Sequence, residues 1–380
     1  MTAATALPPT AEVVVVGAGL HGCSVALHLA LKGLKPLVLE KDYPGRHASG
    51  VNAGGVRTLG RHSAEIPLAL ASRELWHHMV DLVGDDCGFV KSGQVKVAED
   101  EADLARLATR VGELTALGYD HEVLIDQHTL RELLPAVAPH CIGGIFVADD
   151  GYANPYRTVH AFRQRAKALG VQFVPGVEVT GLEPRANTWR LSSSAGSVET
   201  PRVINCAGAW GQHLAAWVDE PVPLRAKAPM LMVTGPLPPF VGPVVGAAGR
   251  PLSFKQYPNG TVVIGGGHTG RARPETNATQ LDIRALASSA RTARAIFPIM
   301  ARASIVRAWA GIEGYCADGI PVIGNSRHPG LYHAFGFSAH GYQLGPAVGA
   351  ALADLVVEGH SNMPLEPFAI HRFTQPVQGC

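Results

Sequence analysis

Residues 13–40 read VVVVGAGLHGCSVALHLALKGLKPLVLE, and this stretch decides the fold. The four valines form an apolar run typical of a strand buried in a parallel sheet. The turn Gly17-Ala18-Gly19-Leu20-His21-Gly22 follows, then a helical stretch, then a second apolar strand that ends at Glu40. Strand, G-x-G-x-x-G turn, helix and acidic strand end occur in this order in dinucleotide-binding βαβ units. The sequence therefore predicts a bound dinucleotide.

Each feature of this unit has a physical task. Gly17 permits the tight turn, Gly19 lets the backbone approach a pyrophosphate, and Gly22 lets the helix pack on the sheet. The N-terminus of the helix carries about half a positive charge and faces the diphosphate. Glu40 lies 21 residues after Gly19, which suits the acid that binds the adenosine ribose about 20 residues after the motif.

Composition indicates a globular α/β enzyme of one large unit or two closely connected domains. The chain has 380 residues, 47% of them hydrophobic, and its 43 glycines suit many strand-to-helix turns. A formal net charge of +1 and the lack of a long basic run argue against nucleic acid or an anionic membrane as a partner. Six scattered cysteines without a C-x-x-C pair, and the lack of H-E-x-x-H spacing, lead us to expect no metal and a reducing compartment.

The sequence offers no targeting or membrane signal. Residues 1–12 lack the basic segment and apolar core of a signal peptide. The longest apolar stretches are interrupted by glycine or charge well short of the roughly 18 residues of a transmembrane helix. We therefore expect a cytoplasmic protein without a transmembrane segment.

The chain changes texture after its first half. Proline-rich turns separate short alternating strands over residues 222–310, followed by a helix near 279–296, as in a mostly antiparallel sheet. A strand at 330–336 and a helix from Pro346 to Val357 then restore the α/β pattern, with proline at the first helical position.

We therefore predict an α/β fold: a discontinuous Rossmann-type nucleotide domain with an inserted, mostly antiparallel substrate domain. The nucleotide domain is expected at residues 1–85, 150–220 and 311–380, and the substrate domain at 86–149 and 221–310. A nucleotide domain closed by C-terminal sequence favours FAD over a pyridine nucleotide, because extended FAD touches several segments.

Four segments together resemble the D-amino-acid-oxidase-like family of FAD-dependent oxidoreductases: residues 17–40, 46–57 (RHASGVNAGGVR), 204–210 (INCAGAW) and 336–346 (GFSAHGYQLGP). Residues 309–314 (WAGIEG) and 318–324 (DGIPVIG) are similar in particular to sarcosine oxidase beta subunits, opine oxidase and D-hydroxyproline dehydrogenase beta-type flavoproteins. The resemblance implies oxidation of the C–N bond of an amino acid or secondary amine, by hydride transfer to flavin N5, to an imine that hydrolyses.

The small residues of segment 48–56 allow backbone N–H groups to approach the diphosphate and the flavin ring, and Ser49 adds a hydroxyl donor; a flexible surface loop is the alternative. Val177 and Val179 follow the adenine-contacting strand of relatives, unless they belong to a plain core strand. Residues 207–209 are expected to be a second close approach, with Trp210 packed behind them, although a strand-ending turn explains them equally well. The predicted cofactor-binding residues are Gly17, Gly19, Leu20, His21, Gly22, Glu40, Lys41, His47, Ala48, Ser49, Asn52, Ala53, Gly54, Gly55, Val56, Val177, Val179, Ala207, Gly208, Trp210, Gly311, Gly341, Tyr342, Gln343 and Leu344.

The flavin's pyrimidine end is expected beside residues 336–346. A helix N-terminus at Pro346 and the preceding glycine N–H groups suit the negative charge that develops there on reduction. His340 either donates a hydrogen bond at this end or is a turn histidine bonded to backbone.

Candidate substrate residues cluster near the flavin loop and the 309–314 segment. Arg57 is expected near the flavin and Arg61 toward substrate, because arginine binds carboxylates with a bidentate fork; a solvated surface arginine is the alternative for each. Glu313 stands where glycine-oxidase-like relatives have an arginine, so it either meets a substrate cation or pairs with a neighbouring Arg or Lys. Tyr257, Lys255 and Trp309 are further pocket candidates, unless the two aromatic rings belong to the core.

Departures from relatives concern oxygen and covalent attachment. Gln343 replaces a lysine of some sarcosine oxidases, and residues 262–264 (VVI) replace the oxygen-activating lysine, which favours a dehydrogenase over an oxidase. Ala310 replaces the flavin-tethering cysteine, so non-covalent FAD is expected.

The electron acceptor is then oxygen, a quinone or a partner protein in a hetero-oligomer. A 2-hydroxyacid dehydrogenase on the same fold, or a flavin subunit active only in a hetero-oligomer, are the alternatives, and a pyridine-nucleotide enzyme is the least favoured one.

Overall fold

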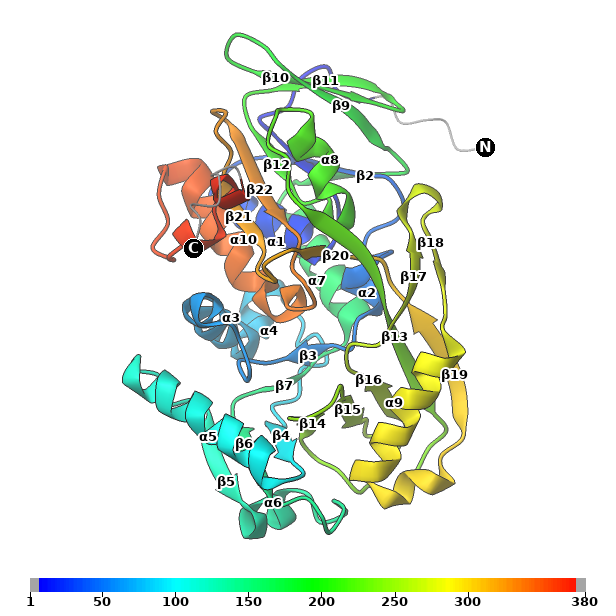
Figure 1. Ribbon diagram of the computed structural model, residues 1–380. Helices are drawn as coiled ribbons and strands as arrows, with labels where there is room; N and C mark the ends of the chain where they lie inside the picture. The colour runs from blue at the N-terminus through cyan, green and yellow to red at the C-terminus, as the bar shows by residue number, and fades with distance from the viewer. Residues whose placement is uncertain (1–6, 374–380) are drawn as a thin grey trace.

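The computed structural model describes residues 7–373. The glycine turn belongs to a six-stranded sheet of order β21-β22-β12-β1-β2-β8, in the upper half of Figure 1. Its strands run parallel except β21, which pairs antiparallel with β22. The strands are β1 (Val13–Val16), β2 (Pro36–Glu40), β8 (Gln172–Pro175), β12 (Val203–Asn205), β21 (Val322–Asn325) and β22 (Leu331–Phe335).

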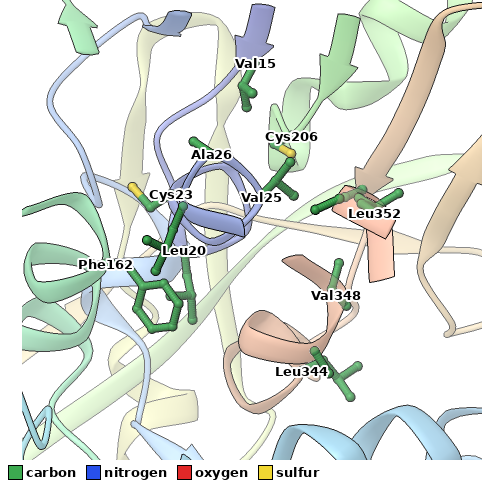
Figure 2. Packing of buried hydrophobic residues seen from close by; sticks show 14 of the residues in the cluster. Val15, Leu20, Cys23, Val25, Ala26, Phe162, Cys206, Leu344, Val348 and Leu352 are labelled. Carbon is green, nitrogen blue, oxygen red and sulfur yellow. The ribbon is translucent and has the colours of Figure 1, made fainter. Parts of the chain in front are cut away.

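Three helices, α1 (Leu20–Leu31), α7 (Pro155–Ala168) and α10 (Gly341–Glu358), share a hydrophobic core with one face of this sheet. Figure 2 shows Leu20 and Val25 of α1 near Leu344, Val348 and Leu352 of α10. Glycines allow this close approach: a β-carbon on Gly349 would overlap Ser24 Oγ. The helix that follows the glycine turn is thereby fixed from two sides.

A small antiparallel sheet of β9 (Val179–Pro184), β10 (Trp189–Ser193) and β11 (Gly196–Thr200) covers the other face. The sequence predicts a strand that contains Val177 and Val179, but it does not predict the β10–β11 hairpin, whose serines resemble a loop. Its alternating Trp189, Leu191 and Val198 point into the core, and each is less than 5% exposed.

The second large sheet has eleven strands, and all its pairings are antiparallel except that of β14 with β4. The predicted α/β fold with a parallel Rossmann-type sheet and a mostly antiparallel sheet is confirmed. The strands of the eleven-stranded sheet come from residues 94–147 and 224–316. The predicted domain boundaries remain a prediction. The strands are β4 (Gln94–Ala98), β5 (Val123–Asp126), β6 (Gly143–Val147), β13 (Leu224–Thr234), β14 (Val244–Ala247), β15 (Ser253–Gln256), β16 (Val262–Gly265), β17 (Thr269–Arg273), β18 (Ala278–Gln280), β19 (Ile305–Ala310) and β20 (Glu313–Cys316).

The remaining elements connect the two large sheets or cover them. A two-stranded sheet pairs β3 (Gly55–Val56) with β7 (Gly151–Tyr152). The other α-helices are α2 (Ala48–Val51), α3 (Ile66–His77), α4 (Met79–Val83), α5 (Glu101–Ala116), α6 (Gln127–Leu133), α8 (Gly211–Ala216) and α9 (Ile283–Ile296). Within residues 7–373, none of the helices combines the length and hydropathy needed to cross a bilayer.

Two helix starts differ from the sequence-based expectation. The helix expected near 279–296 begins at Ile283, because residues 278–280 pair with β17 and Asp282 caps the helix through Arg284 N and Ala285 N.

The prediction that Pro346 opens the last helix is wrong: α10 begins at Gly341 and contains Pro346. Proline removes one backbone donor from a helix, and side chains of α3 support the surrounding turn. Gln343 O accepts Ser72 Oγ at 2.5 Å and Trp76 Nε1 at 2.8 Å. The sequence of α10 alone does not reveal this support.

Candidate active site

The turn between β1 and α1 excludes side chains at its glycines. Gly17 has a φ of +102°, and a β-carbon there would lie 2.5 Å from Cys206 O. A β-carbon on Gly22 would overlap Gly17 O. Both positions therefore require glycine, and the turn presents backbone rather than side chains to the space in front of it.

Gly19 and Ser49 meet at the start of α1. A β-carbon on Gly19 would lie 2.9 Å from Ser49 Oγ, which accepts a hydrogen bond from Leu20 N at 2.9 Å. Ser49 therefore caps a helix N–H, a task that the sequence analysis did not assign to it. Its hydroxyl proton can still be donated to another acceptor.

Glu40 fixes the glycine turn to the end of β2. One carboxylate oxygen accepts Ala18 N at 2.7 Å and the other accepts Asp42 N at 2.9 Å. Burial raises the pKa of Glu40, although both backbone bonds oppose that shift. The carboxylate thus shapes the turn besides lying at the cavity, and the predicted contact with a ribose remains a prediction.

One cavity of about 1210 Å³ joins the glycine turn to the eleven-stranded sheet. Sites for one drug-sized ligand usually measure about 300–1,000 Å³, so this cavity has room for a dinucleotide and a second molecule. The predicted residues that line it are Gly17, Gly19, Leu20, His21, Glu40, Lys41, His47, Ala48, Ser49, Asn52, Ala53, Gly54, Gly55, Arg57, Val177, Val179, Ala207, Gly208, Trp210, Gly311, Glu313, Gly341 and Tyr342.

The other predicted residues lie behind this lining. Gly22 sits beneath the turn, whereas Val56 and Leu344 are fully buried. Trp309 donates its Nε1 to Val51 O at 2.8 Å, and Tyr257 stands edge-on to Tyr152. These residues support the cavity wall and do not form it.

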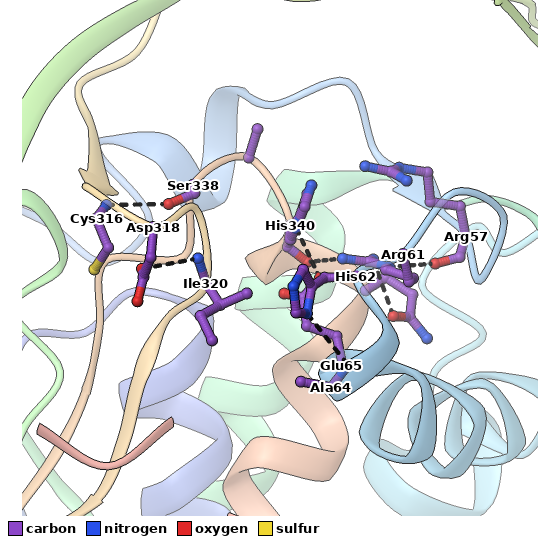
Figure 3. Close-up of polar contacts among 12 residues, drawn as sticks. Arg57, Arg61, His62, Ala64, Glu65, Cys316, Asp318, Ile320, Ser338 and His340 are labelled. Atoms are coloured by element: carbon purple, nitrogen blue, oxygen red, sulfur yellow. Dashed lines mark hydrogen bonds and ion pairs between the residues drawn. The ribbon is translucent and has the colours of Figure 1, made fainter. Parts of the chain in front are cut away.

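Arg61 is buried between α10 and residues 46–57, which we call the flavin-loop segment, and only 1% of its surface is exposed. Its Nε donates to Arg57 O, its Nη1 to His340 O and its Nη2 to Gln343 Oε1, each at 3.0 Å (Figure 3). Burial lowers the pKa of Arg61 to about 9. The sequence predicted that Arg61 points toward the substrate, and the structure contradicts this. Its guanidinium is hydrogen-bonded to other residues of the protein and does not line the cavity.

Gln343 is held in the same network. Its Nε2 donates to Ala69 O at 2.7 Å while its Oε1 accepts from Arg61. The side chain is 1% exposed and lies outside the cavity lining, so Gln343 supports the start of α10 from within.

His340 pairs with a buried carboxylate. Its Nδ1 lies 2.8 Å from Glu65 Oε2, and Glu65 is fully buried outside the cavity lining (Figure 3). Burial raises the pKa of Glu65, but the bond from His340 and the charge of Arg61 lower it more, so the net direction is downward. His340 is therefore bonded to a carboxylate side chain, which differs from the alternative of a turn histidine bonded to backbone.

Glu313 reaches the cavity from β20 without a cationic partner among residues 7–373. Its Oε1 accepts Ala339 N at 2.8 Å, in a loop where Ser338 and Ala339 both adopt positive φ. Burial raises the pKa of Glu313 to about 7. The carboxyl group can therefore gain or lose a proton near neutral pH.

Lys255 is a buried amine behind the flavin-loop segment. Its Nζ contacts Ala53 O and lies 4.9 Å from the Tyr152 ring and 5.3 Å from the Tyr257 ring. Burial lowers the pKa of this lysine to about 7, and it is 3% exposed.

The hairpin formed by β17 and β18 borders the cavity beside Lys41, the residue that follows Glu40. Lys41 Nζ lies 3.1 Å from the Trp210 ring centre and donates to Asn277 Oδ1 at 2.6 Å. Trp210 Nε1 donates to Pro274 O at 3.2 Å. Trp210 thus lines the cavity next to this hairpin, and the expectation that it packs behind the turn is wrong.

Sequence reasoning missed the cavity residues that β4 and β14 contribute. Gln94, Lys96 and Gly246 line the cavity from β4 and β14. A signal existed in β4, because strand alternation puts Gln94 and Lys96 on the face opposite the buried Val95 and Val97. No group of three or more His, Cys, Asp or Glu in residues 7–373 is arranged to hold a metal ion.

Comparison with known proteins agrees with this geometry. The sequence profile of the DAO family, described as FAD dependent oxidoreductase, matches residues 12–355. One of the opine oxidase subunits of Rhizobium meliloti is 29% identical over 383 residues, which cover 95% of this chain and 97% of that protein. The beta chain of sarcosine oxidase from Rhodobacter capsulatus is 24% identical, with 96% and 89% covered. The crystal structure of L-proline dehydrogenase from P. horikoshii superposes with a TM-score of 0.90 at 25% identity and covers 97% of this chain and 99% of that one. The chain belongs to the DAO family of FAD-dependent oxidoreductases.

Proposed function

We propose that this protein uses non-covalently bound FAD to oxidise the C–N bond of an amino acid or secondary amine. The observation that carries the proposal is one continuous cavity lined by Gly17 and Gly19 of the turn at residues 17–22, which we call the glycine cradle, and also by Arg57 and Glu313. Sarcosine-, opine- and hydroxyproline-like compounds are the substrate class, and the names of two relatives favour the first two.

The residues of the cradle fit FAD. Gly17 and Gly19 leave a backbone surface where a β-carbon would intrude, and α1 directs its N-terminus at that surface, as diphosphate binding requires. Glu40 suits the ribose, and Val177 and Val179 suit the adenine. When bound, FAD supplies a hydride acceptor, which the protein's own side chains lack.

The chain orients the substrate through two opposite charges. Arg57 holds a substrate carboxylate, since its Nη1 donates to Leu59 O at 2.7 Å and this bond fixes the fork. Glu313 holds the amine through Oε2, because Oε1 already accepts Ala339 N. Oxidation removes a hydride from the α-carbon and a proton from the nitrogen, and Glu313 accepts that proton. Water then hydrolyses the imine.

The start of α10 supports the same reaction electrostatically. The helix begins at Gly341, shortly after the left-handed Ser338 and Ala339, and its N-terminus borders the cavity. A helix N-terminus stabilises negative charge nearby, so the start of α10 would provide a favourable electrostatic environment for a bound flavin. Arg61, Gln343 and Trp76 hold this helix start in position.

Two related questions must be distinguished by experiment: the bond that is oxidised and the electron acceptor. The same fold and charges suit a 2-hydroxy acid, whose C–O bond would be oxidised instead. Relatives are also named as subunits, which favours electron transfer to a quinone or a partner protein over oxygen as acceptor.

The test is anaerobic bleaching of the bound flavin by matched substrates. D-, L-, N-methyl and cyclic amino acids are compared with 2-hydroxy acids of the same side chain, and the bleached protein is then exposed to air. We expect amino acids to bleach the flavin and hydroxy acids to leave it oxidised. Bleaching by hydroxy acids alone, or by NADH alone, would overturn the proposal. Slow recolouring in air would assign the acceptor to a quinone or partner, and rapid recolouring would assign it to oxygen.

A further inference from the structure

Two cationic side chains face the cavity beside Gly60. Arg57 is the last residue of the flavin-loop segment and Lys96 comes from β4, and both line the cavity. A β-carbon built on Gly60 would lie 3.7 Å from Arg57 Nη1 and 3.9 Å from Lys96 Nζ. The two cations therefore flank the same point, although they come from distant parts of the chain.

Neither cation has a carboxylate partner within the 4.0 Å of an ion pair among residues 7–373. The three nearby acids are engaged elsewhere. Asp150 accepts Thr58 N, Thr58 Oγ1 and Leu59 N at 2.7–2.9 Å. Glu122 accepts Arg110 in a bidentate pair and also Gly60 N, each at 2.7 Å.

The third acid, Glu65, is bonded to His340. Asp150, Glu65 and Glu122 thus act on Arg57 only from beyond ion-pair distance, and Glu122 acts on Lys96 in the same way, so neither cation has a paired carboxylate within residues 7–373.

Like charges at this distance disfavour each other unless an anion lies between them. Burial, and then the charges of Arg57 and Arg110, lower the pKa of Lys96. One carboxylate neutralises only one of the two cations, whereas two carboxylates neutralise both. A ligand with two carboxylates therefore gives each cation a charged partner of its own.

The backbone beside Lys96 leaves room for such a ligand. Gly246 pairs with Lys96 across β14 and β4, and its missing side chain opens the space over the lysine stem. Arg250 also lines the cavity, but its guanidinium is occupied by Glu99. Of Lys96 in β4 and Arg250 in the connection between β14 and β15, Lys96 is the one without a paired carboxylate.

We propose that Arg57 and Lys96 form a two-carboxylate site, so that the substrate is a secondary amine carrying one carboxylate on each arm. This inference rests on the proposed function for the amine, while the carboxylate site itself is independent of turnover. Arg57 takes the carboxylate of the arm that is oxidised, and Lys96 takes the second one. An N-methyl amino acid offers only the first.

The test uses redox-inert thioethers, so that it does not depend on catalysis. Thiodiacetate and (methylthio)acetate differ by one carboxylate, and their binding to the FAD-loaded protein is measured by the change in flavin absorbance. A charge-assisted hydrogen bond corresponds to about a tenfold or larger change in affinity, so we expect thiodiacetate to bind at least about tenfold more tightly. Equal affinity of the two probes for the wild-type protein would overturn the proposal, whatever the variants do.

Variants of Lys96 test whether this side chain causes the preference for thiodiacetate. Lys96→Met is expected to weaken thiodiacetate about tenfold and to leave (methylthio)acetate within about twofold, whereas Lys96→Arg retains the preference. Lys167→Met removes the same charge from an exposed helix position outside the cavity and serves as the matched control. Equal weakening of both probes by Lys96→Met would contradict the assignment.

A matched pair of amines separates this proposal from the proposed function. Iminodiacetate and sarcosine differ in the same way as the two thioethers. If neither amine nor any amino acid bleaches the flavin while the thioether preference holds, amine oxidation fails and the two-carboxylate site stands. If amino acids bleach the flavin but thiodiacetate shows no preference, the two-carboxylate site fails alone.

Discussion

Replacement of Arg61 by methionine tests whether this residue holds the site together or binds substrate. The change keeps a long side chain and removes the three donors that reach Arg57 O, His340 O and Gln343 Oε1. These acceptors belong to the flavin-loop segment and to the start of α10. We therefore expect lower stability and weaker FAD retention, without a selective loss of carboxylate binding.

The magnitude follows from the three acceptors. A buried acceptor left unpaired costs about 1–3 kcal/mol, and water entering the vacated space recovers part of it, so we expect the free energy of unfolding to fall by about 4 kcal/mol. An unfolding entropy of about 2.1 cal/mol/K per residue gives about 0.8 kcal/mol/K for 380 residues, so Tm should fall by about 5 °C.

Thermal unfolding followed by flavin fluorescence measures this shift. Arg61→Lys keeps the charge but not the fork, and we expect an intermediate Tm. Arg165→Met removes an exposed arginine from α7 and is expected to change stability by less than about 0.5 kcal/mol. A Tm of Arg61→Met within about 1 °C of wild type, together with a tenfold or larger rise in KM for carboxylate substrates, would refute the structural role of Arg61.

Three further perturbations follow from the site. Gly22→Ala places a β-carbon on Gly17 O and should yield protein without FAD. The control Gly112→Ala, at a helix position with no atom within 4 Å, should keep FAD and raise the free energy of unfolding by about 0.5–1 kcal/mol. Released flavin per chain and Tm measure both variants, and a Gly22→Ala protein fully loaded with FAD would contradict the glycine cradle. Because the pKa of Glu313 is about 7, the affinity for an amino acid that bleaches the flavin should rise between about pH 6 and about pH 8 as the carboxylate forms. Glu313→Gln should remove this pH dependence of the affinity. The same pH dependence in Glu313→Gln would exclude Glu313 as the amine partner. Lys255 has a pKa of about 7 in the folded protein and a usual value of 10.5, so between these pH values the unfolded chain binds more protons and the folded state becomes more stable as pH rises. The difference in Tm between wild type and Lys255→Met should therefore shift in favour of wild type from about pH 7 to about pH 9.5. A Tm difference that does not change with pH would refute the lowered pKa.

The glycine cradle could be predicted from sequence because its requirements are local. Gly17, Gly19 and Gly22 act within one turn, where a β-carbon meets neighbouring backbone or Ser49. The same is true of Glu40, which returns to Ala18 N at the end of the next strand. Short-range geometry of this kind can be recognised in a single chain.

The substrate end could not be predicted in the same way. Arg57 and Arg61 look equivalent four residues apart, yet Gly60 has a φ of +73° and the chain turns, so Arg57 lines the cavity while Arg61 points into the protein. Lys96 reaches the cavity only because β4 pairs with β14 in a sheet built from distant segments.

The start of α10 shows the same limit. Pro346 lies inside the helix, in a turn that α3 supports through the bonds of Ser72 and Trp76 to Gln343 O. Such tertiary support is not encoded near the proline.

Flavin content of the purified protein tests most directly whether this cavity holds FAD. We predict a yellow protein that holds one FAD per chain and releases it on denaturation, since the cradle, the flavin-loop segment and the start of α10 all border one cavity. A colourless protein that also fails to bind added FAD would contradict the proposed cofactor site and the chemistry built on it.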